Sequence, residues 1–133
     1  MPKQLNQDIK KVNAITVQVI NATTEGSAID TKLSEIFNFE TALFHAEVGN
    51  LGDQTSTKIK IQESDSATFA SGVTTAEGGD EVTVAADTSY KFEVLRTKRY
   101  LRAVVTITGG SSPSAEIYVG AILWNASKPF PII

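Results

Sequence analysis

The stretch 90–108 constrains the fold more than any other part of the sequence. Apolar residues recur at every second position, first at Tyr90, Phe92 and Val94 and again from Leu101 onwards, with polar residues between them. Alternation with a period of two is typical of a β-strand that buries one face and exposes the other. A short basic segment separates the two runs. The stretch therefore predicts two consecutive strands at the centre of a β-sandwich.

The same alternation predicts further strands on both sides of this stretch. In 12–20, Ile15, Val17 and Val19 are predicted to share the buried face of a first strand. The remaining strands are predicted over 27–32, 57–62, 81–85 and 115–124, with Gly-rich and Ser-rich turns between them. A turn and a further short strand are predicted over 64–72, with Phe69 buried. About eight short strands and no convincing helix predict an all-β fold, an antiparallel β-sandwich of jelly-roll or immunoglobulin-like type.

The segment 36–48 is apolar and aromatic, but its alternation changes phase. Phe37 and Phe39 fall on one parity, whereas Phe44 and Val48 fall on the other. A β-bulge would reconcile the two halves, because one extra residue reverses the alternation. Two short strands would do so equally well, and the sequence alone leaves both interpretations open.

Composition limits the class of protein. The 133 residues suffice for one domain with a sizeable core, and the absence of cysteine excludes a disulfide scaffold. A net charge of −3 argues against binding to nucleic acid, which usually requires a basic excess. The first residues lack the apolar core of a signal peptide, and no apolar run approaches the roughly 20 residues of a membrane helix. We therefore expect a protein made in a cytosol, with no nucleic-acid partner and no membrane partner.

The sequence also suggests how the chain is divided. Residues 1–11 are polar and show no period, so we expect an N-terminal arm. Residues 12–124 carry the strand patterns of the sandwich domain. Residues 125–133 contain two prolines, which disfavour a helix or a central strand, so we expect an extended C-terminal tail.

The sequence offers no apparatus for catalysis. The one histidine, His45, lies inside an apolar strand, where a structural role is far more common than base catalysis. No Gly-x-Ser-x-Gly motif activates a serine, and the acidic turns at 63–65 and 77–81 lack the spacing of a calcium loop. We therefore predict a protein that is not an enzyme and that needs no metal or other cofactor.

Basic residues concentrate in one part of the chain. Five of the twelve lysines and arginines fall within 91–102. The favoured interpretation is a solvated strand face with local ion pairs, because charge runs usually have that role. The alternative is a surface that steers docking onto an acidic partner. Under this alternative, the candidate partner-binding residues are Lys98, Arg99 and Arg102.

The last predicted strand is apolar on both of its faces. Opposite its core-facing row lie Tyr118, Ile122 and Trp124, although an antiparallel sheet usually keeps one face polar. A large exposed apolar patch normally marks a binding surface. Either the tail folds back over this row, or it reaches a neighbouring subunit and makes the protein a homodimer or homotrimer. The tail adds further candidates for partner binding, which are Phe130, Ile132 and Ile133.

Three short motifs follow one another along the chain. They are Gly26-Ser27-Ala28-Ile29-Asp30-Thr31, Gln62-Glu63-Ser64-Asp65 and Arg99-Tyr100-Leu101-Arg102. In this order they resemble the motifs of a family of small structural proteins of tailed bacteriophages and prophages. The resemblance implies a capsid decoration or cement protein that binds the major capsid protein and stabilises contacts between its subunits. It also implies a virion component on the capsid exterior, made in the host bacterial cytoplasm. The longer segment 36–48 and the tail depart from the family, so its partner contacts do not carry over.

A second resemblance gives a competing function. The strand Arg99-Tyr100-Leu101-Arg102 is also similar to one in discoidin-like carbohydrate-binding jelly rolls. The resemblance implies a carbohydrate-binding module of a phage adhesion or tail structure. Such a module presents exposed aromatic rings on which sugars stack, and Tyr118 and Trp124 are the candidates.

Overall fold

The computed structural model describes residues 9–32 and 39–124, which form ten β-strands and no helix. The strands are β1 (Ile9–Ile20), β2 (Thr24–Glu25), β3 (Ile29–Asp30), β4 (Thr41–Leu51), β5 (Ser56–Ser64), β6 (Thr74–Thr75), β7 (Val82–Thr83), β8 (Thr88–Leu95), β9 (Tyr100–Thr108) and β10 (Ala115–Trp124). All of their pairings are antiparallel. The predicted all-β, antiparallel fold is confirmed.

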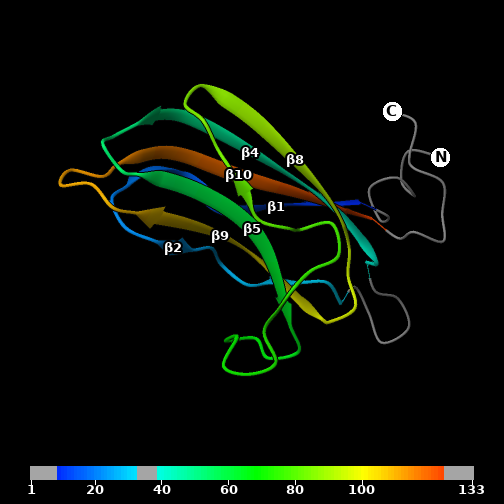
Figure 1. Ribbon diagram of the computed structural model, residues 1–133. Helices are drawn as coiled ribbons and strands as arrows, with labels where there is room; N and C mark the ends of the chain where they lie inside the picture. The colour runs from blue at the N-terminus through cyan, green and yellow to red at the C-terminus, as the bar shows by residue number, and fades with distance from the viewer. Residues whose placement is uncertain (1–8, 33–38, 125–133) are drawn as a thin grey trace.

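The strands form two sheets that lie face to face (Figure 1). One sheet has four strands in the order β1-β10-β4-β8, and the other follows the path β2-β9-β5-β6, with β3 also pairing with β9 and β7 with β5. The first strand pairs with the last, and most connections cross from one sheet to the other. This is the jelly-roll topology, the first of the two predicted types. If β2 with β3 and β6 with β7 each count as one interrupted strand, the predicted number of about eight strands also agrees.

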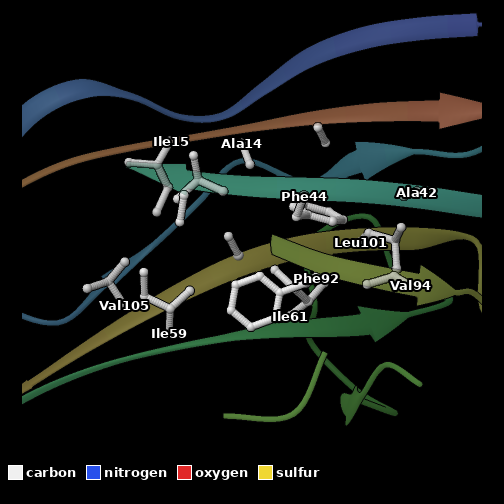
Figure 2. Packing of buried hydrophobic residues seen from close by; sticks show 14 of the residues in the cluster. Ala14, Ile15, Ala42, Phe44, Ile59, Ile61, Phe92, Val94, Leu101 and Val105 are labelled. Carbon is white, nitrogen blue, oxygen red and sulfur yellow. The ribbon is translucent and has the colours of Figure 1, made fainter. Parts of the chain in front are cut away.

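The core fills the space between the two sheets. Phe44 on β4 and Phe92 on β8 point inward from the four-stranded sheet, toward Ile59, Ile61 and Leu101 of the other sheet (Figure 2). None of these side chains is more than 4% exposed. Burial of apolar surface, which contributes about 25 cal/mol per Å², is the main source of stability in such a core. The predicted inward rows of β8 and β9 are confirmed, and β5, which covers the strand predicted over 57–62, likewise buries every second residue.

Strand β1 departs from its predicted pattern because it is irregular. Register shifts against β10 occur on both sides of Ile15. Ala14 and Ile15 are consequently both buried, whereas Val17 and Val19 are 80% and 66% exposed. The prediction that Ile15, Val17 and Val19 share one buried face is wrong, because each shift inserts a residue and reverses the alternation.

The short strand predicted within 64–72 is wrong, because residues 65–72 form turns, although Phe69 is buried as predicted. Two predicted boundaries also change. β1 begins at Ile9, so the last residues of the predicted arm 1–11 pair with β10. Within the segment 36–48, the described residues contain one regular strand, since β4 begins at Thr41 and pairs with β8 without a register shift. Phe39 is buried just before this strand. In the described part of the segment, the change of phase therefore marks the start of a strand and involves neither a bulge nor a second strand.

The two strands of the stretch 90–108 belong to different sheets. β8 is an edge strand beside β4, whereas β9 lies within the other sheet beside β5. The basic segment between them is therefore one of the connections that cross from one sheet to the other. The prediction of two consecutive strands is confirmed, but the two strands do not pair with each other.

Removal of the Phe44 ring tests the contribution of the core. Phe44 is fully buried. We expect Phe44→Ala to lower the free energy of unfolding by about 3–5 kcal/mol, because the two sheets cannot close the cavity that remains. Chemical denaturation followed by circular dichroism measures the difference. Val82→Ala, at a side chain that is 37% exposed, is the control and should change the value by less than about 1 kcal/mol. Equal effects of the two substitutions would contradict this description of the core.

Candidate functional site

The four-stranded sheet has one face turned away from the core, which we call the outer face. It is formed by the outward-pointing rows of β1, β10, β4 and β8. β10 runs through its middle, between β1 and β4. The outward residues Tyr118, Ile122 and Trp124 are half-buried on this face, opposite the buried row of the same strand. The alternation of the sequence placed them correctly.

Apolar side chains of neighbouring strands extend this row. Leu43 on β4 pairs with Ile122 on β10. Thr41 pairs with Trp124 on one side and with Leu95 on the other, and Leu95 is 44% exposed. Cross-strand partners lie about 5 Å apart, so these side chains contact one another across the sheet. Leu43, Leu95, Ile122 and Trp124 thus form an apolar band near one end of the outer face, with Glu93 of β8 beside Leu43.

Three shallow hollows follow β10 along the outer face. One hollow of about 540 Å³ is lined by Leu95 and Trp124, among other residues. A second, of about 480 Å³, borders Tyr118 at the centre of the face. The third, of about 390 Å³, is bordered by Val17 and Val19 of β1. Concave apolar surfaces with a few polar groups are typical binding sites.

A polar cluster lies at the centre of the outer face. The Tyr118 hydroxyl donates a hydrogen bond to Asn13 Oδ1 at 3.0 Å, and the Tyr118 ring lies 5.7 Å from the His45 ring. Both side chains reach over Gly120, where a β-carbon would lie 2.4 Å from the Tyr118 oxygen and 2.7 Å from His45 Nε2. Only glycine leaves room for them, which is a recurrent use of glycine within strands. The contacts of His45 agree with the structural role predicted for it.

Two of the predicted basic residues lie at the crossing between β8 and β9, with partners in the chain. Arg99 donates two hydrogen bonds to the Asp30 carboxylate, from Nε at 2.9 Å and from Nη2 at 2.7 Å. The backbone N–H of Arg99 donates to Asp65 Oδ1 at 3.1 Å. Lys98 Nζ donates to the Gly72 carbonyl oxygen. These contacts favour the interpretation of the basic residues as local ion pairs.

The third basic residue, Arg102, points outward from β9 on the other sheet. Its guanidinium lies 2.9 Å from the Glu25 carboxylate, and its Nε donates to Gln62 Oε1 at 2.9 Å. The guanidinium carbon lies 4.3 Å from the centre of the Phe69 ring, a cation–π contact. The Arg102 side chain is only 14% exposed. It is therefore packed into the surface of the six-stranded sheet.

The predicted partner-binding residues do not all share one surface. The three on β10 lie together on the outer face, whereas the basic ones lie at the crossing and on the other sheet. Phe130, Ile132 and Ile133 lie outside the described residues, and their part in binding stays a prediction. Four residues that border the outer face were missed, because they reach it only through strand pairing and the irregularity of β1: Val17, Val19, Leu43 and Leu95.

Within residues 9–32 and 39–124, no group of three or more His, Cys, Asp or Glu side chains converges to hold a metal ion. Nor does this part of the chain contain a helix that is long and apolar enough to cross a membrane.

The fold is similar to several solved structures. The SPBc2 prophage-derived protein YomS aligns with a TM-score of 0.50 and 12% identity, over 87% of this chain and 92% of that chain. A protein of the disulfide-linked pili of Bacillus endospore appendages gives 0.45 and 14%, over 89% and 88%. PirA gives 0.42 and 18%, over 88% and 93%. No family model and no curated protein matches the sequence. At 12% identity, the likeness to YomS shows a shared fold alone.

The pair of Arg99 and Asp30 predicts a pH-dependent stability. The hydrogen bond from Arg99 lowers the pKa of Asp30 from 3.8 to about 2, against the opposing effect of burial, and the Lys32 N–H and the charge of Arg99 lower it further. Because the folded pKa is depressed, the unfolded chain takes up the proton first as the pH falls. The pair therefore contributes fully above the unfolded pKa, and its contribution is lost as the pH falls toward about 2.

Asp30→Asn isolates this contribution. We expect the variant to lose about 1 kcal/mol of unfolding free energy at pH 7, a value discounted because the Asp30 side chain is 40% exposed. The difference from the wild type should shrink toward zero near pH 2. Urea denaturation at both pH values measures it, and comparison with the wild type cancels the titration of other carboxylates. An equal difference at both pH values would show that Arg99 does not hold the Asp30 carboxylate.

Proposed function

We propose that this protein is a non-enzymatic structural component of a bacteriophage virion, and specifically a capsid decoration or cement protein. In this proposal, the outer face docks on the outside of the head and binds the major capsid protein. Neighbouring capsid subunits are stabilised because one docked copy contacts more than one of them. The observation that carries the proposal is the apolar band of Leu43, Leu95, Ile122 and Trp124 on the outer face, with the hollow beside it.

The size of the outer face suits a specific protein interface. Four strands that lie about 4.8 Å apart and are roughly ten residues long span an area on the order of 600 Å². A standard interface buries about 800 Å² on each partner. Apolar surface buried there contributes about 25 cal/mol per Å² before the costs of association. The outer face thus supplies most of the area that specific docking requires.

The phage part of the proposal is supported by two comparisons. The three sequence motifs resemble those of phage and prophage structural proteins, and YomS, which has the same fold, is prophage-derived. The motifs themselves meet at the crossing between β8 and β9, where Asp30 and Asp65 both accept hydrogen bonds from Arg99. Their contacts serve the fold, so we assign docking to the outer face and leave the motifs a structural role.

A charge placed on the outer face tests the proposal. We expect Ile122→Glu, and separately Leu43→Glu, to weaken binding to phage heads by roughly tenfold or more, since an unpaired carboxylate must then be desolvated at the interface. Co-sedimentation with heads that lack the wild-type protein measures the loss. Both side chains are only half-buried, so the variants should fold, which circular dichroism checks.

Val82→Glu is the matched control, because Val82 is an exposed valine on β7, which belongs to the six-stranded sheet and not to the outer face. This variant should bind heads as the wild type does. Folded outer-face variants that bind heads normally would exclude docking through this face. Failure of the wild type itself to bind heads would exclude the decoration function.

A carbohydrate-binding module is the second candidate, because Trp124 and Tyr118 border hollows large enough for sugar rings. Trp124 is the only tryptophan in the chain, so its fluorescence emission reports on that site. We expect the emission to change when the protein binds heads and to stay unchanged with bacterial surface polysaccharides. A saturable change with a polysaccharide alone would favour the second candidate, since sugars stack on aromatic rings.

A further inference from the structure

Strand β1 forms one edge of the four-stranded sheet, and part of this edge has no strand beside it among the described residues. The Ala14 carbonyl oxygen accepts a hydrogen bond from the Ser27 N–H at 3.1 Å, so the edge is covered there. Beyond this point, residues 16–19 are all exposed. The backbone N–H and C=O groups of an uncovered edge are a template on which another strand can pair.

The opposite edge of the same sheet, β8, is protected. The Leu95 N–H donates a hydrogen bond to the Glu77 carbonyl oxygen at 3.1 Å. Gly78, whose φ is +85°, approaches the Glu93 carbonyl oxygen so closely that a β-carbon would lie 1.8 Å from it. Lys91 and Glu93 place charges along the strand. A covering loop and edge charges are the usual means of preventing pairing between molecules.

The free part of β1 has no such charges. Residues 12–24 contain no Lys, Arg, Asp or Glu. Val17 and Val19 are 80% and 66% exposed, a high exposure for apolar β-branched residues. The irregularity near Thr16 bends the strand, but residues 18–20 pair with β10 in regular register. An uncharged edge can pair with a second copy of itself without repulsion between like charges.

We propose that β1 of one copy pairs antiparallel with β1 of a second copy, about a two-fold axis that passes near Gln18. In this register, Val17 of each copy faces Val19 of the other. Cross-strand pairs of β-branched residues stabilise antiparallel sheets. The two four-stranded sheets then become one continuous sheet. The contact is isologous, as in most homodimers.

The dimer has a consequence that rests on the proposed function. A two-fold axis that relates antiparallel strands of one sheet is perpendicular to that sheet, so the outer faces of both copies point to the same side. One dimer would therefore present two apolar bands to a head at once, and the second contact would form at a high effective concentration. The existence of the dimer does not depend on what the outer faces bind.

A single cysteine tests the pairing, because the chain has none of its own. Oxidation of Gln18→Cys should give a disulfide-linked dimer on a non-reducing gel, since residues beside the axis have β-carbons within reach of a disulfide. Thr75→Cys, an exposed site on β6, is the matched control and should stay monomeric. Light scattering of the wild type should give twice the monomer mass of 14.3 kDa. A monomeric wild type, or Gln18→Cys that cross-links no faster than Thr75→Cys, would overturn the proposal.

Two further variants test whether the dimer forms through the β1 edge or through another surface. Val17→Lys combined with Val19→Lys should raise the dissociation constant of the dimer by roughly tenfold or more, because lysines would face each other across the axis. A variant that ends at Asn125 should remain a dimer, and its conversion to monomer would assign self-association to the tail instead. Binding of heads is scored in a separate co-sedimentation. Loss of head binding by a protein that still dimerises would overturn the docking proposal and leave the dimer intact.

Discussion

One buried carboxylate, Glu63 near the end of β5, holds the segment in which the chain crosses from β8 to β9. Glu63 is 4% exposed, and its oxygens accept hydrogen bonds from the Thr97 N–H at 2.8 Å, the Thr97 hydroxyl at 2.6 Å and the Lys98 N–H at 3.1 Å. A buried carboxylate is destabilising unless donors satisfy it. Here the donors belong to the crossing itself, so the crossing has one favoured conformation. That conformation sets where β9 begins, and a shift of one residue would turn its whole inward row outward.

The regular strands could be predicted from the sequence because their alternation is uninterrupted. The inward rows of β5, β8 and β9 follow from a period of two, and no long-range information is needed. β1 could not be predicted in this way, because its register shifts exist only in relation to β10: Ala14 and Ile15 both face the core, whereas Val19 is exposed. Valine and isoleucine suit either side of a half-buried strand, so the local pattern does not mark where the alternation breaks.

The candidate site could likewise be predicted only in part from the sequence. The outward row of β10 could be predicted, since alternation shows a second apolar row opposite the core. Its neighbours could not, because Leu43 comes to lie beside Ile122 only through a strand order that joins distant segments. The basic residues are close together in the sequence but have separate partners in the fold. They are dense in the sequence, yet Arg99 and Arg102 each bind a carboxylate on a different strand, so their charges are neutralised within the fold. These contacts agree with the favoured interpretation of local ion pairs, and the density of basic residues in the sequence does not by itself mark a docking surface.

The two outer surfaces of the sandwich differ in how their apolar residues are covered. On the six-stranded sheet, Val104 points away from the core and is still only 4% exposed, while the Phe69 ring is buried against the Arg102 guanidinium. On the four-stranded sheet, Leu95 is 44% exposed and Val19 is 66% exposed. The six-stranded sheet thus covers these outward apolar residues with its own side chains. The four-stranded sheet leaves apolar residues and hollows exposed, and a partner that buried them would gain free energy. This asymmetry is the physical reason for proposing that partners bind at the outer face and at its β1 edge.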